Sequence, residues 1–468
     1  MIGNKFHTLF CLVLAICFSC QIDDSTSPSP GDTFLKYYGD DGAQEGQGLL
    51  FLEDEGTFLI YGVQNTSVEG SSANLYMLIV DEQGNELRSG SFDFQSEFTE
   101  LNTNAADDIP GSVVYDPSLG FVYVGSSTRF DVGNNSTFNA LVWAQINVNL
   151  DSTLIASGEI IQADTTVQND GNQTVDFKDV SAKDVVVIDG TELLIVGSSS
   201  KVQSGDLTEP ADEDETQIYT ARVSLATGEV LRERTNGFIG NDEGLYIDQF
   251  GDDDFVIVGT TENRSGTDGL NTYFLPITGN GVPLEGSSIG FPIGGADRSA
   301  SETVFDVFKR PNGYVITGAS IRGTESNPFF INVSYFGGGN FAEDVADTIS
   351  VIAEAPNDNN QLVTQSLNAG ASAITLGDNG NYFVAGSILS YPGDPGKAGE
   401  ILILQSDQEG DLVPGTVRNY GLVSGNDAAN EILSLEDGSL LILTTVDFGG
   451  NTSLIGLMKV NQSGDLMN

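Results

Sequence analysis

Asp184-Val-Val-Val-Ile-Asp-Gly-Thr-Glu-Leu-Leu-Ile-Val-Gly197 contains two apolar runs that are separated by Asp189-Gly190 and followed by a glycine. Asp-Gly between apolar runs is a strong hairpin signal, so the segment predicts two antiparallel strands joined by a tight turn. The same pattern returns in six further segments: Gly48–Gly62, Ser112–Gly125, Leu245–Gly259, Val304–Gly318, Ala373–Gly386 and Glu431–Thr444. Such recurrence is the signature of a repeat fold, in which neighbouring units share a core.

Each copy continues into a third strand, and every copy except the last into a fourth. After the copy at 184–197, Tyr219–Leu225 predicts the third strand, Ala226-Thr-Gly228 a turn, and Glu229–Arg234 the fourth strand. Seven copies of four short antiparallel strands predict an all-β fold, a seven-bladed β-propeller over residues 33–468. Two unrelated all-β sandwiches are the alternative.

The first and last strands complement each other. The seventh copy has no fourth strand, because the chain stops at Asn468 soon after the third strand, Leu454–Val460. At the other end, Thr33–Tyr38 matches a fourth strand that has no copy of its own. We therefore expect this N-terminal strand to complete the last blade and close the ring, which would leave no exposed edge of an open array.

Two features recur in most copies and predict structural roles. Glycines end the second strands, at Gly62, Gly125, Gly197, Gly259, Gly318 and Gly386, and we expect them to allow a tight backbone turn. Aspartates precede several first strands, at Asp41, Asp242, Asp297 and Asp427, where the side chain can cap backbone amides.

The N-terminus has the pattern of a lipoprotein signal. Lys5 is followed by the apolar run Leu9–Phe18, which is too short to span a bilayer comfortably, and residues 17–20 (Cys-Phe-Ser-Cys) resemble a bacterial lipobox. This predicts a signal peptide over 1–19, lipidation at Cys20, an acidic and Ser/Pro-rich flexible tether over 20–32, and the propeller after it. A plain signal peptide cleaved elsewhere and a lipoprotein facing the periplasm are the alternatives.

The repeats and the leader together resemble a known family. An Asp before the first strand and a following D-G-aromatic-apolar-apolar-x-G core are similar to the repeats of seven-bladed propeller lipoproteins of Bacteroidota. The acidic pair Asp23-Asp24 resembles the surface-export signal of such lipoproteins. The resemblance implies an outer-membrane lipoprotein that faces the cell exterior, and it concerns the fold more than the ligand.

Composition excludes several function classes. Asp and Glu number 67 against 18 Lys and Arg, a formal net charge of -49, so the surface repels nucleic acid and anionic lipid. The only histidine, His7, and two of the three cysteines, Cys11 and Cys17, would leave with the signal peptide. Ser-His-Asp and Cys-His catalysis, histidine-ligated zinc and haem are then excluded in the mature chain.

Acidic clusters that do not repeat are candidates for calcium, which prefers hard oxygen ligands. The candidate ligands are Asp206, Asp212, Asp214, Asp252, Asp253 and Asp254. None of the clusters has EF-hand spacing, and a solvated acidic surface is the alternative explanation. No other cofactor is expected.

The predicted loops are unequal in length. Those between first and second strands are short, whereas the loops between second and third strands and between blades are long, and in a propeller both long sets emerge on one face. Insertions confined to one face are typical of a binding surface. Aromatic residues in or near these loops are the candidate partner contacts: Phe94, Phe98, Phe130, Phe138, Phe177, Phe341 and Tyr391. The single Trp143 is expected in the core.

We conclude from the sequence that the protein is a non-catalytic, lipid-anchored cell-surface protein. Its expected role is that of a binding or scaffold subunit in an outer-membrane protein complex, such as a TonB-dependent transporter assembly. The alternative is a glycan-binding or glycan-cleaving propeller of a polysaccharide-utilisation system, because a two-carboxylate glycosidase needs no histidine.

Overall fold

The structure is a computed structural model, and it describes residues 33–39, 42–66, 73–94, 107–131, 136–167, 173–200, 215–237, 240–262, 270–284, 289–291, 301–356, 362–390, 399–421, 426–449 and 452–466. Its regular structure consists of β-strands, so the protein is all-β. Within these residues, no helix has the length and apolar character needed to cross a membrane.

Five antiparallel sheets of four strands each make up most of the described chain, and within each sheet the strands pair in chain order. Their strands are β6 (Asp108–Asp116), β7 (Gly120–Asp131), β8 (Ser136–Ile146) and β9 (Leu154–Ile160); β12 (Val180–Ile188), β13 (Glu192–Ser199), β14 (Gln217–Ser224) and β15 (Val230–Asn236); β16 (Asp242–Gln249), β17 (Asp254–Glu262), β18 (Leu270–Thr278) and β19 (Ile289–Phe291); β20 (Ser301–Arg310), β21 (Gly313–Arg322), β22 (Glu325–Tyr335) and β23 (Phe341–Thr348); β26 (Asn368–Leu376), β27 (Tyr382–Ser390), β28 (Glu400–Ser406) and β29 (Arg418–Tyr420).

An eight-stranded sheet contains the first and the last described strands. It is formed by β1 (Phe34–Tyr38), β2 (Gly42–Leu52), β3 (Thr57–Thr66), β4 (Ala73–Val80), β5 (Glu86–Phe92), β30 (Ala428–Ser434), β31 (Leu440–Gly449) and β32 (Thr452–Val460). β1 pairs antiparallel with β32 and so takes the fourth position beside β30, β31 and β32. A parallel bridge between Ala43 and Ser453 joins β2 to β32.

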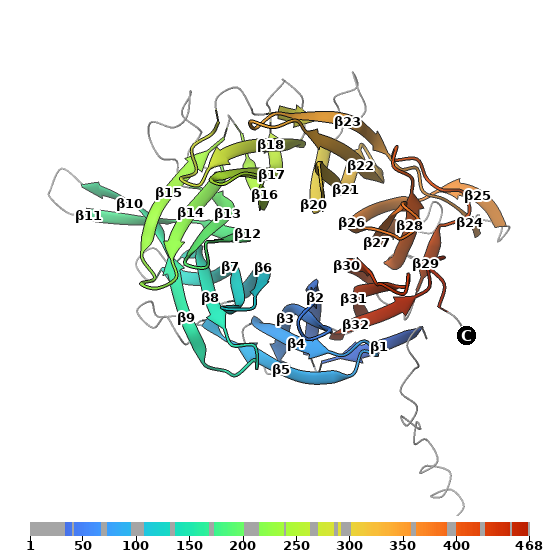
Figure 1. The fold of residues 1–468 in the computed structure, drawn as a ribbon, viewed down its shortest axis with the longest axis horizontal. Helices are drawn as coiled ribbons and strands as arrows, with labels where there is room; N and C mark the ends of the chain where they lie inside the picture. Colours follow the sequence, from blue (N-terminus) through green and yellow to red (C-terminus); the bar gives the residue numbers. More distant parts are fainter. Residues whose placement is uncertain are drawn as a thin grey trace, which may run out of the picture.

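The sheets lie around a common centre, with β2, β6, β12, β16, β20, β26 and β30 innermost (Figure 1). Apolar side chains on the second and third strands are buried between neighbouring sheets, as where Val124 of β7 and Trp143 of β8 share a cluster with Ile195 of β13. Trp143 is 1% exposed, which confirms the core position predicted for it. The arrangement is that of a propeller-like protein.

Every innermost strand has a β-bulge at the same position. The extra residue lies between paired positions such as Ala182 and Asp184, and the six other innermost strands show the same shift. In six of the seven, the partner of the residue before the bulge is a repeated glycine, as Gly197 is for Ala182. The interpretation of these glycines as turn residues is therefore wrong. They lie within strands, where a Cβ would overlap the carbonyl oxygen of a residue on the bulged strand.

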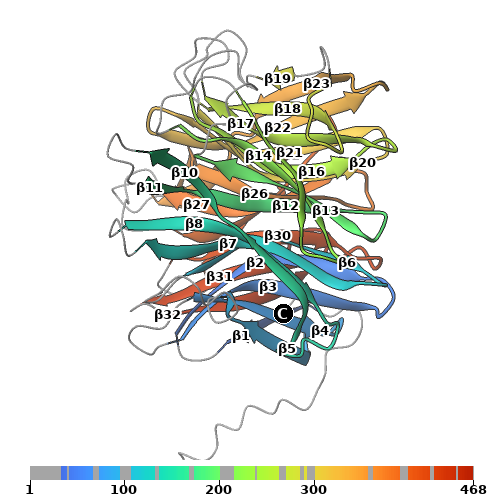
Figure 2. The same ribbon diagram turned by 90° about the vertical axis from the view of Figure 1, so that its left-hand side faces the viewer.

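The two ends of the sheets differ in the length of the connections between strands. Because neighbouring strands are antiparallel, turns between first and second strands and between third and fourth strands lie at one end, which we call the short-turn face. Connections between second and third strands and between sheets lie at the opposite end, the long-loop face. Figure 2 shows the molecule edge-on, with β10 (Gln162–Val167) and β11 (Gln173–Lys178) at the end opposite the β12–β13 turn.

Two hairpins are added to the four-stranded pattern. β10 pairs with β11, and β24 (Ile352–Pro356) pairs with β25 (Leu362–Ser366). Both hairpins lie in connections between sheets, and both point outward from the ring (Figure 1). The segments 162–179 and 337–368, parts of connections expected only as long loops, thus contain regular structure, including β23 in the second.

Candidate functional site

Three of the aromatic residues proposed to contact a partner are part of the core instead. Phe94 is 0% exposed and stacks on Tyr123 with ring centroids 5.0 Å apart. Phe138 is 4% exposed and stacks on Phe177 at 4.6 Å. Phe341 is also 4% exposed, and its ring packs among four other aromatic rings. The prediction that these three rings face a partner is wrong, because each ring packs against aromatic side chains of other strands.

The remaining predicted contact residues have different outcomes. Phe130 and Phe177 are half-buried and keep some surface accessible to a partner. Phe98 and Tyr391 lie outside the described residues, as does Cys20, the predicted lipidation site.

Of the predicted calcium ligands, the structure describes only residues 252–254. Asp252 and Asp253 are exposed in the turn between β16 and β17, and Asp254 begins β17. Across the described ranges, no group of three or more His, Cys, Asp or Glu side chains is placed to hold a metal ion. Asp206, Asp212 and Asp214 lie outside those ranges, so calcium binding there stays a prediction.

Aspartates at the starts of innermost strands connect backbone segments. Asp427 accepts a hydrogen bond from the backbone N–H of Asp447 at 3.1 Å. Asp108, which the sequence did not single out, accepts from the Phe94 N–H at 3.2 Å and from the Ser127 hydroxyl at 2.6 Å. Burial raises the pKa of Asp108 to about 7 despite these bonds. Asp41 and Asp297 lie outside the described residues.

The β-bulges bring a second set of polar residues together near the centre. The residue that follows the bulge is Asp184 in β12, Tyr246 in β16, Asp306 in β20 and Glu431 in β30. Tyr61 of β3 joins them, because the equivalent residue of β2 is Gly48, and its lack of a side chain leaves room for the Tyr61 ring. We call Tyr61, Asp184, Tyr246, Asp306 and Glu431 the inner cluster.

Two carboxylates of the inner cluster hold neighbouring sheets together. Asp184 Oδ2 accepts a hydrogen bond of 2.9 Å from the Ile247 N–H of the next sheet. In the same way, Asp306 Oδ2 accepts one of 2.8 Å from the Ile374 N–H, while Asp306 Oδ1 accepts from the Val307 N–H at 2.7 Å. These bonds give the carboxylates a structural role that accounts for their position.

Burial makes ionisation of the inner cluster costly. It raises the pKa of Asp184 and of Asp306 to about 6, although the backbone hydrogen bonds act in the opposite direction. The pKa of Glu431 is raised further above its usual range, first by burial and then by the negative charge of Asp306. Burial also raises the pKa of Tyr61, and the charges of Glu431 and Asp184 add to it, which shows that the members interact.

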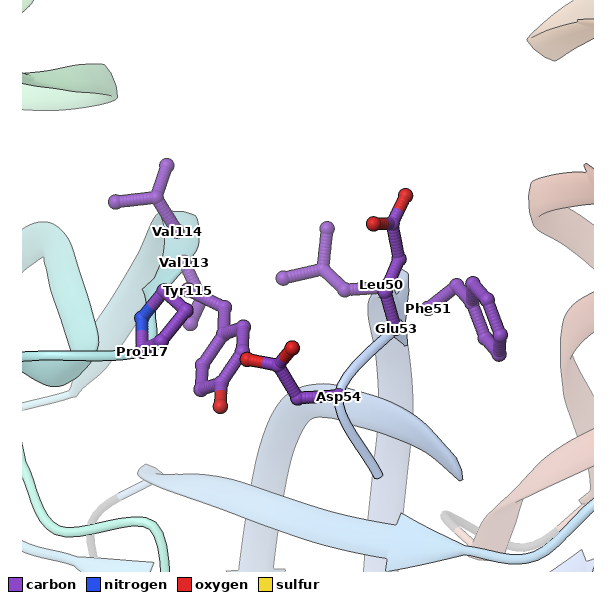
Figure 3. Close-up of a pocket in the computed structure, with 8 residues that line it drawn as sticks. All are labelled: Leu50, Phe51, Glu53, Asp54, Val113, Val114, Tyr115 and Pro117. Atoms are coloured by element: carbon purple, nitrogen blue, oxygen red, sulfur yellow. The ribbon is translucent and has the colours of Figure 1, made fainter. Parts of the chain in front are cut away.

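Two cavities lie between innermost strands on the side of the short-turn face, and one of them reaches the inner cluster. One of about 350 Å³ is lined by β6, β12 and β16, with Asp184, Tyr246 and Asp248 in its wall. A second, of about 400 Å³, lies between β2 and β6. Figure 3 shows the Asp54 carboxylate beside the ring of Tyr115 in this cavity, and the Phe51 ring turned away from it. Acidic and apolar walls of this kind disfavour an anionic ligand.

A signal for the inner cluster was present in the sequence. Counting back 13 residues from Gly197, Gly259 and Thr444 reaches Asp184, Tyr246 and Glu431, whereas Asp306 lies 12 residues before Gly318. What this spacing could not show is that these positions point toward the centre, because that orientation follows from the bulge and from the arrangement of the sheets.

Comparisons with known proteins concern the fold only. No family model matches the chain, and no curated protein matches it. Similar solved structures include a protein of unknown function from Dyadobacter fermentans, with 9% identity over 92% of this chain and 97% of that chain and a TM-score of 0.45. The Dos1 propeller has 12% identity over 91% of this chain and 95% of that chain, with a TM-score of 0.40.

A third similar structure is an enzyme. It is the Trypanosoma rangeli sialidase in complex with the inhibitor DANA, at 9% identity over 93% of this chain and 59% of that chain, with a TM-score of 0.40. At such identities and scores the similarities accord with an all-β, propeller-like fold and carry no argument about activity or ligand. Propeller folds serve both binding and catalysis.

Proposed function

We propose that the protein is a lipid-anchored binding protein built on a closed, seven-bladed propeller. The five four-stranded sheets and the two four-strand halves of the eight-stranded sheet support seven blades. Closure is supported by the pairing of β1 with β32, which puts strands from the two ends of the described chain into one blade.

The proposed anchor is a lipid on Cys20, which would hold the ring at the outer membrane with its binding surface outside the cell. This part of the proposal depends on the leader: the lipobox-like residues 17–20 and the acidic pair Asp23-Asp24 after them, which are similar to those of Bacteroidota surface lipoproteins.

The observation that carries the binding role is the position of the added structure. Both hairpins, β10–β11 and β24–β25, are additions to the long-loop side of the repeat. The stacking of Phe177 on Phe138 fixes β11 to β8, and the Asn139 N–H donates to Asp179 Oδ1 at 2.7 Å. Firmly held additions at one face are typical of a recognition surface.

The proposed partner is an outer-membrane protein complex, with the propeller as a binding or scaffold subunit. A carboxylate-rich protein of net charge -49 is not suited to nucleic acid. A non-catalytic role accords with the hydrogen bonds of Asp184 and Asp306, whose oxygens accept from the backbone of the next sheet.

Affinity isolation of the tagged protein from gently solubilised envelopes tests this function. We expect a membrane protein to be recovered in stoichiometric amount with the lipidated protein and to be lost with Cys20→Ala. Recovery of the lipidated protein alone would contradict the scaffold role.

The alternative, a glycan-binding or glycan-cleaving protein, has one structural observation in its favour. Asp306 and Glu431 are interacting carboxyl groups with raised pKa values, and a general acid needs a carboxyl group that stays protonated near neutral pH. Glycan turnover that is abolished by Glu431→Gln and retained by Glu436→Gln, a change at an exposed carboxylate of the same sheet, would favour this alternative.

A further inference from the structure

The direction of β1 determines where the chain joins the propeller. Phe34 lies opposite Lys459, one residue before the end of β32, and Tyr38 lies opposite Ile455 near the start of β32. β32 is a third strand and runs from the long-loop face to the short-turn face. β1 is antiparallel to it, so β1 begins at the short-turn face.

Side-chain contacts of β1 agree with this direction. Residues 81–85 form the turn between β4 and β5, at the short-turn face of the adjacent blade. Lys36 Nζ donates to Asn85 Oδ1 in this turn at 2.5 Å. A side chain on Gly84 of the same turn would overlap the Phe34 ring. The Tyr38 hydroxyl, from the other end of β1, reaches Gly84 of the same turn, so these contacts hold β1 beside the short turn while its direction follows from the pairing with β32.

We infer that the short-turn face is turned toward the membrane and that the long-loop face points away from it. This inference rests on the lipid anchor at Cys20 proposed above. Cys20 to Asp32 comprises 13 residues, which can span at most about 45 Å. A strand such as β27, with nine residues, is about 30 Å long. The tether joins β1 at the short-turn face. If the long-loop face were turned to the membrane, the tether would have to run past the whole height of the sheet, which would use about 30 Å of its reach of about 45 Å.

Exposed apolar side chains accompany exposed carboxylates, such as those of Asp378 and Glu436, at the short-turn face. Phe336, in the turn between β22 and β23, is 69% exposed, and Leu231 and Leu376 near other short turns are 45% and 39% exposed. Apolar side chains at the tips of turns can reach into the interfacial region of a bilayer.

This orientation narrows the kind of partner that the long-loop face can bind. The partner must present its contact surface in the solvent, beyond the headgroups, on the side of the ring away from the bilayer. A protein domain that projects from the membrane, or a soluble macromolecule, satisfies this condition. The bilayer-embedded wall of a membrane protein does not.

Energy transfer to the membrane tests the orientation. After signal cleavage the chain has no cysteine other than Cys20, so an added cysteine is the only reactive thiol. Asp378→Cys places a donor dye in the exposed turn between β26 and β27, at the short-turn face. Leu389→Cys places it near the other end of β27, at a residue that is 50% exposed. Each lipidated variant is reconstituted into phosphatidylcholine vesicles that contain an acceptor-labelled lipid.

We expect the donor at residue 378 to lose most of its emission to the acceptor and the donor at residue 389 to lose little, because the two sites are about 30 Å apart along the strand. Equal loss at both sites, or greater loss at residue 389, would overturn the orientation. Flotation of the vesicles reports the anchor separately. Protein that floats with the vesicles but shows the wrong pattern refutes only the orientation, whereas failure to float refutes the lipid anchor and the inference that rests on it.

Discussion

Single residues make the bulged innermost strands possible. Gly386 pairs with Ala371, the residue before the bulge of β26, and a Cβ at this glycine would overlap the carbonyl oxygen of Gly370. The glycine is therefore required by close approach of two backbones and not by an unusual φ angle, since its φ is not positive. The same explanation holds for the other glycines that face a bulge.

Gly386→Ala is expected to lower the free energy of unfolding by about 1–3 kcal/mol, the usual cost of forcing extra atoms into a packed core. Urea denaturation of the purified protein measures it. Gly370→Ala is the matched control in the same sheet, because a Cβ there would meet only Ala319 Cβ, at 3.5 Å. An equal effect of the two changes would contradict the explanation.

At the scale of elements, β1 is the strand whose loss we expect to destabilise the protein most. It covers the edge of β32, and its Tyr38 hydroxyl donates to the Gly84 carbonyl at 2.6 Å across to the neighbouring blade. Without β1, β32 would expose unpaired backbone groups, which promote association between chains. β1 therefore contacts the turn between β4 and β5 as well as pairing with β32.

A chain that begins at residue 42 is expected to unfold at lower temperature than one that begins at residue 33, and to associate. Thermal unfolding followed by circular dichroism and size-exclusion chromatography measure the two effects. A peptide of residues 33–39 added in excess should restore part of the lost stability. Unchanged thermal unfolding of the shorter chain would show that β1 does not contribute to the stability of the ring.

For the whole molecule, charge controls the dependence of stability on pH. The pKa values of Asp184 and Asp306 are raised to about 6, and that of Asp108 to about 7, from an ordinary value of 3.8. The folded protein thus binds protons more tightly than the unfolded chain, so these groups lower stability as the pH rises from about 4 to about 7. A shift of two pKa units corresponds to about 3 kcal/mol. Mutual repulsion at a net charge of -49 acts in the same direction.

The free energy of unfolding is therefore expected to be higher at pH 5 than at pH 8 by a few kcal/mol, as measured by urea denaturation. Glu431→Gln should raise stability at pH 8, because it removes a carboxyl group that must either stay ionised beside Asp306 or take up a proton when the chain folds, and should change stability little at pH 5. Glu436→Gln, at an exposed position, should have a small effect at both values. Stability that rises between pH 5 and pH 8 would contradict this account.

Sequence alone determined the repeated unit and the order of its strands. Alternating apolar runs and Gly/Asp turns, as at 184–197, act over a few residues, so they are visible without knowledge of the fold. The unpaired strand at 33–38 and the core position of Trp143 followed from the same local patterns. The hairpins at 162–178 and 352–366 did not, because their strands are only five or six residues long and lack the apolar runs of the repeat.

Only the tertiary structure decided which side chains meet. Phe94, Phe138 and Phe341 lie near predicted loops, yet each is covered by residues from another strand or loop, and burial of this kind depends on how the sheets pack. Asp184, Asp306 and Glu431 are far apart in sequence and converge because each follows a bulge on an innermost strand. The face from which the chain leaves toward its N-terminus was likewise settled by the pairing of β1 with β32, since the direction of a strand in a sheet is set by its partner.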